Sequence, residues 1–254
     1  MKIISETYFY CPPNQIHTDI VSITGPEAKH LCAVLRCAEG DQVTIVDGIG
    51  HEFQTTVERI RPDRMEGRIL SRHQGHRDPR IRITLAQAYG RAPMFDTVVE
   101  KATELGVSEI IPVISRKSPP GQAAERTEKR LERWQHIAIS AMKQSKRALL
   151  PAIRHPHSMD ELLALPSTCA LRLIAWEQEQ RHGLHEMLAG RCPDTICVMV
   201  GPESGFDEME IDKAVQAGFR PFSMGRRRLR SETAGPLAVA LVLYECGEMG
   251  SGRP

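Results

Sequence analysis

From Ile81 onward, short apolar runs typical of buried strands alternate with segments of helical periodicity. The first unit is a predicted strand, 81–88, followed by a helix with the apolar face Met94, Val98, Val99, Ala102 and Leu105. With helices between them, further strands are predicted at 107–115, 169–176, 195–200 and 221–224. Because parallel strands need long crossover connections, this alternation predicts an α/β fold with a mostly parallel sheet covered on both faces.

The first third of the chain has a different pattern. Short β-rich runs at 43–46, 53–60 and 65–69 alternate with turn residues, and one helix is predicted at 26–37. Residues 71–80 contain no strongly apolar side chain before Ile81 and end in a proline-containing turn. We therefore predict three parts, which are a β-rich domain over residues 1–72, a linker over 73–80 and an α/β domain over 81–254.

Composition limits the classes of function. The chain has 41% hydrophobic and 26% charged residues, as soluble globular proteins do. Its net charge is only +1, so a nucleic-acid site would need a local basic patch. Aromatic residues make up 5% of the chain, which disfavours a binder that works mainly by stacking bases.

The sequence also bears on compartment and metals. The longest uninterrupted apolar run, 237–244, is far shorter than the roughly 20 residues that span a bilayer. Glu6 interrupts any apolar segment of a secretory signal, so no membrane association and a cytoplasmic location are expected. The seven cysteines include no CxxC pair, so we expect buried residues or free thiols and no metal site.

One loop with a composition suited to ligand binding follows the apolar strand 195–200. It is Gly201-Pro202-Glu203-Ser204-Gly205-Phe206. In open α/β sheets ligands bind at the carboxyl ends of strands, and glycine lets the backbone approach a flat ligand closely. An ordinary strand-to-helix turn is the alternative interpretation. The loop has neither the GK[ST] of a P-loop nor a GxGxxG fingerprint.

A second unusual loop, 224–234, follows the next predicted strand. Its arginines at 226, 227, 228 and 230 suit a clamp on phosphate or nucleobase, with a solvated basic loop as the alternative. The helix that follows is apolar on all sides over 237–243, so we expect it to be buried in the domain or between subunits. Special loops at two adjacent strand ends favour a site between them.

Other basic residues are candidates for RNA contact. The segment 143–147 has no acidic residue nearby and could meet phosphates. On the predicted helix 26–37, His30 and Arg36 are further candidates, although a lone histidine more often has a structural role. The predicted RNA-binding residues are His30, Arg36, Arg116, Arg147, Arg226 and Arg228.

Five motifs together make the chain recognisable. They are HLCAVLRCAEGD (30–41), VVEKATELGV (98–107), QSKRALLP (144–151), GPESGF (201–206) and MGRRRLRSETA (224–234). In this order they resemble the bacterial 16S rRNA (uracil 1498-N3)-methyltransferase family of the SPOUT superfamily. The resemblance implies an N-terminal PUA-like β-barrel, a C-terminal SPOUT domain with a trefoil knot, a homodimer, and S-adenosylmethionine bound at the knot. The implied partner is 16S rRNA within the small ribosomal subunit.

The resemblance also assigns site residues. The cofactor-binding residues it implies are Trp176, Glu177, Gly201, Pro202, Glu203, Ser204, Met224, Gly225, Leu229, Ser231, Thr233 and Ala234. Ser204 stands where the family usually has glycine, which could restrict the loop backbone. Lys143 stands where the family commonly has an acidic residue, which argues against a catalytic role at that position.

Methyl transfer to uracil N3 sets its own requirements. N3 is protonated at neutral pH, so a group must accept its proton or stabilise the resulting anion. Arg230, permanently charged, is the candidate for stabilisation. Glu232 is the candidate base, unless it fixes the loop by pairing with an arginine. A sulfonium methyl is already electrophilic, so no metal is required, and the target base is expected to be unpaired or extruded.

Two other functions are compatible with parts of the sequence. A non-catalytic RNA-binding ribosome-assembly factor would use the same β-rich domain and basic loops, but it would have no reason to bind S-adenosylmethionine. A nucleotide-dependent transferase is weakened by the missing phosphate-binding loop.

Overall fold

The chain folds into two compact units, each with its own core. The computed structural model describes residues 2–90, 92–117, 124–166, 168–188, 190 and 192–250. The first unit comprises Met1–Asp78 and Ile139–Leu150, and the second comprises Pro79–Ala138 and Pro151–Pro254.

A five-stranded sheet forms most of the first unit. Its strand order is β1-β3-β4-β5-β2, in which β1 and β3 are parallel and the other neighbours are antiparallel. The strands are β1 (Ile3–Tyr10), β2 (Ile20–Thr24), β3 (Gln42–Val46), β4 (His51–Arg61) and β5 (Arg64–Gln74). The predicted β-rich domain is therefore present, and β5 continues two residues into the predicted linker.

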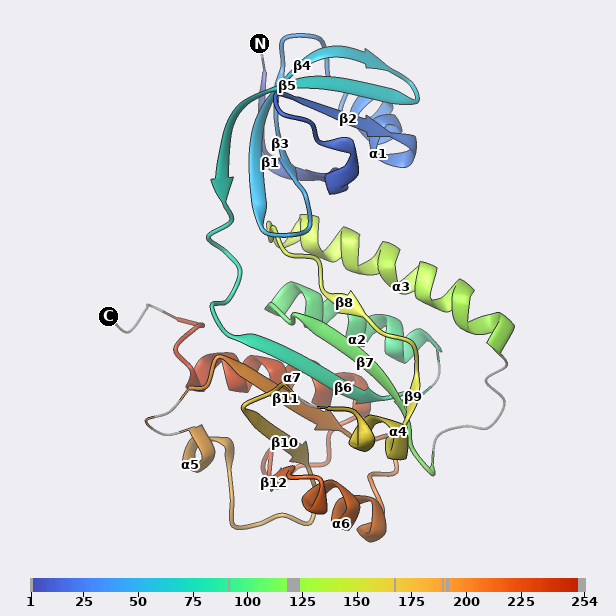
Figure 1. The fold of residues 1–254 in the computed structure, drawn as a ribbon, viewed down its shortest axis with the longest axis vertical. Helices are drawn as coiled ribbons and strands as arrows, with labels where there is room; N and C mark the ends of the chain where they lie inside the picture. The colour runs from blue at the N-terminus through green and yellow to red at the C-terminus, as the bar shows by residue number, and fades with distance from the viewer. Residues whose placement is uncertain are drawn as a thin grey trace. The chain divides into compact units, whose positions relative to one another are not determined.

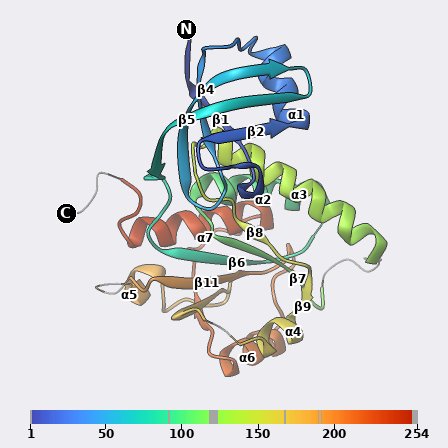
Figure 2. The same cartoon turned by 45° about the horizontal axis from the view of Figure 1, so that its top comes forward.

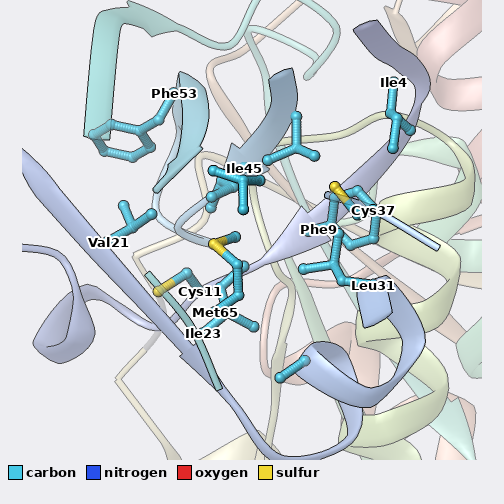
Figure 3. Close-up of a cluster of buried hydrophobic side chains, with 13 residues drawn as sticks. Ile4, Phe9, Cys11, Val21, Ile23, Leu31, Cys37, Ile45, Phe53 and Met65 are labelled. Atoms are coloured by element: carbon cyan, nitrogen blue, oxygen red, sulfur yellow. The ribbon is translucent and has the colours of Figure 1, made fainter. Parts of the chain in front are cut away.

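Alternating side chains of these strands form the core of the first unit. Val21 and Ile23 of β2 point inward and pack in one cluster with Phe9 and Ile45. Figure 3 shows this cluster, with Leu31 and Cys37 close to Phe9. Burying side chains of this size supplies about 1.5–3 kcal/mol each, so the sheet and the short helical segment stabilise one another.

The predicted helix 26–37 is shorter in the structure. It consists of α1 (Gly25–Lys29) and a π-helical turn, η2 (His30–Val34), and a separate 3-10 turn, η1 (Pro13–Gln15), precedes β2. The helix ends because Arg36 adopts a left-handed conformation with φ of 49°. The Cys37 N–H then donates to the Leu31 carbonyl at 3.0 Å, which closes the turn.

Residues 139–150 join the first unit, although they lie within the range predicted for the second domain. They include the last turns of α3 (Ala124–Gln144). The Asp78 carboxylate accepts hydrogen bonds from Arg147 Nε at 2.7 Å and from the N–H groups of Ala148 and Leu149 at 2.9 and 3.1 Å. These contacts between residues about 70 positions apart have no local sequence pattern, so the periodicity of α3 could not reveal them.

The second unit contains a seven-stranded sheet, and the pairing of its strands is parallel, as predicted. The order is β12-β10-β11-β6-β7-β8, and β9 also pairs with β7. The strands are β6 (Arg82–Ala88), β7 (Glu109–Ile114), β8 (Ala152–Ile153), β9 (His157–Ser158), β10 (Leu171–Ala175), β11 (Thr195–Val200) and β12 (Arg220–Phe222). Figure 1 shows that β11 and β6 lie at the centre of this sheet.

Helices cover both faces of the parallel sheet, again as predicted. Its helices are α2 (Ala92–Leu105), α4 (Met159–Ala164), α5 (Leu184–Leu188), α6 (Glu208–Gln216) and α7 (Ser231–Glu245). Helices α2 and α7 pack together on one face, where α7 contacts β6 and β11. The views in Figures 1 and 2 agree that α4 and α6 lie on the opposite face.

The C-terminal helix α7 is buried along only part of its circumference. Ala238, Val239, Val242 and Leu243 are buried against the second unit. The stripe Leu237, Ala240, Leu241 and Tyr244 is half-buried or exposed, and Tyr244 reaches 65% exposure. An apolar stripe at this helical spacing is suited to contact another protein surface.

The cysteine prediction needs one correction. Cys192, just before β11, forms a disulfide with Cys246 at the end of α7. The other five cysteines form no disulfide. Because the two bonded residues are 54 positions apart, only the fold brings them together.

The sequence predicts neither a metal site nor a membrane-spanning segment, and both predictions can be compared with the residues that the structure describes. Within them, no cluster of His, Cys, Asp and Glu side chains has the geometry to hold a metal ion. Among the same residues, no helix has the length and apolar character needed to cross a membrane.

Candidate active site

A cavity of about 850 Å³ lies where β10, β11 and β12 end. Three loops line it, namely the loop after β10, the loop 201–206 after β11, and the loop 223–231 after β12. The order β12-β10-β11 makes these strands neighbours, so their carboxyl ends meet at one edge of the sheet. The volume falls within the range of small-molecule sites, about 300–1,000 Å³.

The loop after β11 needs glycine at one position. Gly205 has φ of +70°, and its N–H donates to the Pro202 carbonyl at 2.9 Å. A Cβ at this position would stand 3.0 Å from the Glu177 carboxylate. Gly205 therefore permits both the turn and the close approach of Glu177 to the loop.

The loop after β12 is fastened to the loop after β11 through Ser231. The Ser231 hydroxyl donates to the Gly201 carbonyl at 3.0 Å and accepts a hydrogen bond from Gln87 Nε2 at 2.8 Å. Gln87 is buried in β6, while Ser231 begins α7. This chain of hydrogen bonds fixes the start of α7 against two central strands.

A second link between the same loops is made by Arg228. Its Nη2 donates to the Glu203 carbonyl at 3.1 Å, while the side chain is otherwise exposed. The loop 224–234 is thus held in place and still presents cationic groups to solvent. A clamp on a phosphate or nucleobase requires both properties.

The loop after β10 brings acidic side chains to the cavity. The Glu179 carboxylate accepts hydrogen bonds from the N–H groups of Arg181 and His182 at 2.6 and 3.1 Å. The bond from Arg181 is the main cause that lowers the pKa of Glu179. Hydrogen bonds from the backbone N–H groups of Glu186 itself and of Gly183 likewise lower the pKa of the Glu186 carboxyl. Both carboxylates are therefore ionised at neutral pH.

A second cavity, of about 660 Å³, lies next to the first. It is lined by Pro93, Met94, Glu203, Arg228, Leu229, Arg230 and Glu232. Arg228 and Leu229 line both cavities, so the loop after β12 forms a wall between them. The predicted catalytic pair, Arg230 and Glu232, belongs to this second cavity.

Arg230 and Glu232 have different surroundings. Arg230 Nη1 lies 3.9 Å from Glu232 Oε1, and the side chains are 83% and 19% exposed, respectively. Glu232 Oε2 is buried and has no hydrogen-bond partner within the described part of the chain. The alternative role for Glu232, pairing with an arginine, is therefore supported by its contact with Arg230. That contact uses Oε1 and not Oε2.

The predicted RNA-binding residues lie on the loop after β12, beside the loop after β11, and in the first unit. Arg226 and Arg228 are exposed on the loop after β12, and Arg116 is exposed beside the loop after β11, with Nη1 3.4 Å from Asp207. Arg36 is exposed in the first unit, whereas the half-buried His30 ring packs 6.1 Å from the Phe9 ring. His30 thus has the structural contact that a lone histidine usually has.

Arg147 requires a correction. It is only 2% exposed, and its guanidinium pairs with Asp78 in the first unit. Its side chain therefore fastens residues 139–150 to that unit and is not available to phosphate. A basic run in the sequence does not reveal that one of its members is buried.

Both departures from the family pattern have structural explanations. Among the described residues other than glycine, only Arg36 and Lys146 have positive φ, so Ser204 does not occupy a conformation that requires glycine. Lys143 forms an ion pair with Glu27 in the first unit. Ser204 therefore does not strain the loop, and the role of Lys143 is a structural contact.

Comparison with known proteins identifies the family. The RNA methyltransferase domain family matches residues 76–243, and the RNA methyltransferase PUA domain family matches residues 23–70. The ribosomal RNA small subunit methyltransferase E of Mesomycoplasma hyopneumoniae is 32% identical over 176 residues, which cover 69% of this chain and 75% of the relative. The chain belongs to the ribosomal RNA small subunit methyltransferase E family.

Solved structures of similar proteins agree with this assignment. The methyltransferase E of Neisseria gonorrhoeae, bound to S-adenosylmethionine, has a TM-score of 0.83 at 32% identity and covers 94% of this chain and 97% of its own. A methyltransferase from Legionella pneumophila in complex with the same cofactor has a TM-score of 0.84 at 29% identity, with coverage of 93% and 96%. The predicted family and the fold class, a PUA domain followed by a SPOUT methyltransferase domain, are confirmed.

In this methyltransferase E chain, the implied cofactor residues do not all line one cavity. Most of them line the first cavity; the exceptions are Glu203, Ser204 and Thr233. Glu203 lines the second cavity, and the other two line neither. The lining segment 179–183 was not predicted, although its polar residues lie in the loop that begins at the end of β10, at the same edge of the sheet.

Proposed function

We propose that this protein transfers a methyl group from S-adenosylmethionine to N3 of one uridine, uracil 1498, of 16S rRNA. The observation that carries the proposal is the cavity formed by the loops after β10, β11 and β12. Relatives that share this fold over more than nine-tenths of their chains hold S-adenosylmethionine.

The first cavity suits the chemistry of this cofactor. Bound S-adenosylmethionine supplies a methyl group on a positively charged sulfur. Glu177, Glu179 and Glu186 line the cavity and offer negative charge for a cationic ligand, and Leu229 and Ala234 offer apolar surface. The Trp176 indole N–H is buried without a partner among the described residues, so it is a donor for a polar ligand atom.

The residues of the second cavity suit removal of a proton from the target base. Glu232, whose Oε2 has no hydrogen-bond partner among the residues that the structure describes, accepts the N3 proton in this proposal. The guanidinium of Arg230 lies beside it and stabilises the negative charge that the deprotonated base spreads over N3 and its neighbouring oxygens.

The proposed partners follow from the family and from the surface of the second unit. The substrate would be 16S rRNA, contacted by Arg226, Arg228 and Arg116, within the small ribosomal subunit in the cytoplasm. The half-exposed stripe Leu237, Ala240, Leu241 and Tyr244 of α7 supports a homodimer. A second copy that covered this stripe would complete the burial of a helix that is apolar on all sides.

Calorimetry with S-adenosylmethionine tests this function against that of a non-catalytic RNA-binding assembly factor. The wild type should bind the cofactor. Gly205→Ala should abolish most of the binding, because its Cβ would meet Glu177 at the edge of the cavity. Gly247→Ala is the matched control, since Gly247 also has positive φ but nothing lies within 4 Å of its Cβ position. Absence of binding by the wild type would favour the assembly factor.

A further inference from the structure

We propose that the second cavity is the pocket for the target uracil, and that Pro93 and Met94 at the start of α2 form the wall against which the base packs. The inference rests on the proposed function and adds to it a subsite and two residues outside the recognised motifs. All seven lining residues belong to the second unit.

The polar groups of the cavity complement the pairing edge of uracil. That edge presents a donor, N3–H, between two acceptors, O2 and O4. The cavity offers a carboxylate acceptor from Glu232 and guanidinium donors from Arg228 and Arg230. Arg228 uses Nη2 to reach Glu203, and its guanidinium has further N–H groups. The cavity therefore offers an acceptor for N3–H and donors for O2 and O4.

The buried oxygen of Glu232 is the strongest single observation. A carboxylate oxygen that is shielded from solvent and lacks a partner is unfavourable, and such groups are rare in folded proteins. A base that enters the cavity with its N3–H toward Glu232 would satisfy this oxygen. The Arg230 contact at 3.9 Å leaves Oε2 free for that bond.

Two of the lining residues, Pro93 and Met94, are apolar. Met94 is half-buried, and Pro93 precedes it on the first turn of α2. A methionine thioether makes favourable contacts with aromatic rings, and its flexible side chain adapts to the face of a base. The wall thus provides the stacking surface that the few aromatic residues of the chain do not provide.

The position of the cavity fits transfer between two bound molecules. Leu229 and Arg228 line both cavities, so a base in the second cavity is the immediate neighbour of a ligand in the first. The same arrangement rejects cytosine, whose N3 has no proton to donate to Glu232. The pocket therefore explains both the proximity of the reactants and the choice of base.

Methionine-methyl NMR tests the pocket directly, because three methionines report on separate places. Met94 lines the second cavity, Met224 lines the first, and Met209 is 56% exposed on α6 outside both. With ¹³C-methyl-methionine protein, uridine 5′-monophosphate should shift the Met94 resonance in a saturable way and leave Met209 unmoved. Cytidine 5′-monophosphate should shift Met94 much less.

The outcomes separate this inference from the proposed function. S-adenosylmethionine could shift the Met224 resonance while uridine monophosphate fails to shift Met94, both in the free protein and in the protein with bound S-adenosylmethionine. In that case the assignment of the base pocket is wrong and the cofactor site stands. If S-adenosylmethionine leaves Met224 unmoved, the proposed function itself fails.

Variants provide a second readout. Met94→Ala should raise the KM for the RNA several-fold with little change in S-adenosylmethionine affinity, and Met94→Leu should restore most of the loss. Met209→Ala is the control on the surface of α6. An unchanged KM in Met94→Ala would overturn the assignment of this wall.

Discussion

Two neighbouring residues at the start of α7 have complementary properties. Arg230 is 83% exposed and permanently charged, while Glu232 is 19% exposed and has a buried oxygen without a partner in the described chain. An exposed cation can move toward the negative charge that develops on a base. A shielded carboxylate can accept a proton from the base at a place that water does not reach. The proposed chemistry depends on this difference.

Arg230→Ala should reduce the rate of methyl transfer by about 10²–10³-fold, the usual cost of removing one group that stabilises a developing anion. The affinity for S-adenosylmethionine should stay nearly constant, because Arg230 lines the second cavity and not the first. Single-turnover kinetics and calorimetry measure the two quantities. Arg82→Ala, at an exposed position of β6, is the control, and unchanged turnover in Arg230→Ala would exclude Arg230 from the mechanism.

Ser231→Ala tests the link between the two cofactor loops. The change removes the hydrogen bond to the Gly201 carbonyl and leaves the buried Gln87 amide without its acceptor. The free energy of unfolding should fall by about 1–3 kcal/mol, and S-adenosylmethionine should bind more weakly. Urea unfolding and calorimetry check both effects, with Ser204→Ala as the control at an exposed position of the neighbouring loop. Equal affinity in the two variants would contradict the fastening role of Ser231.

At the scale of elements, the sequence predicts the order of strands and helices better than the contacts between them. The alternation from Ile81 onward predicts each main strand of the parallel sheet. Because ligands bind at the carboxyl ends of parallel strands, the sequence also predicts that the loops after β11 and β12 lie at one edge. The segment 179–183, Pro93 and Met94 were not assigned to the site. No local periodicity marks a loop or a helix start that meets another loop far along the chain.

The disulfide between Cys192 and Cys246 is an element-scale constraint that encloses both cofactor loops. Cys246→Ser should lower the free energy of unfolding by about 2–4 kcal/mol under oxidising conditions, because the unfolded chain loses a closed loop. A reducing agent should remove the difference from the wild type. Cys32→Ser, at a free and half-buried cysteine, is the control in denaturant unfolding. Equal stability of Cys246→Ser and wild type without reductant would contradict the bond.

At the scale of the whole molecule, the proposed homodimer depends on the stripe of α7. Leu241→Glu places a charge in the middle of this stripe and should give a monomer in analytical ultracentrifugation. Val215→Glu, on α6 at a position that is 46% exposed, should leave the association state unchanged. A wild type that sediments as a monomer would contradict the dimer but not the cofactor site.

The organisation of the molecule also shows what a single sequence leaves open. Motif order over nearly the whole chain was sufficient to recognise the family, whereas the membership of residues 139–150 in the first unit was not predicted. Their attachment depends on Asp78, which binds Arg147 and the next two backbone N–H groups. From the sequence alone, a buried aspartate such as Asp78 cannot be distinguished from a solvated one in the same polar segment.

In the proposed function, the loops 201–206 and 224–234 hold a methyl donor beside a uridine of 16S rRNA. Mass spectrometry of 16S rRNA from a strain that lacks this gene tests it most directly. We expect 3-methyluridine to disappear at one position, and we expect the wild-type gene to restore it and the Arg230→Ala gene not to restore it. An unchanged pattern of methylation in the deletion strain, or loss of a different modified base, would contradict it.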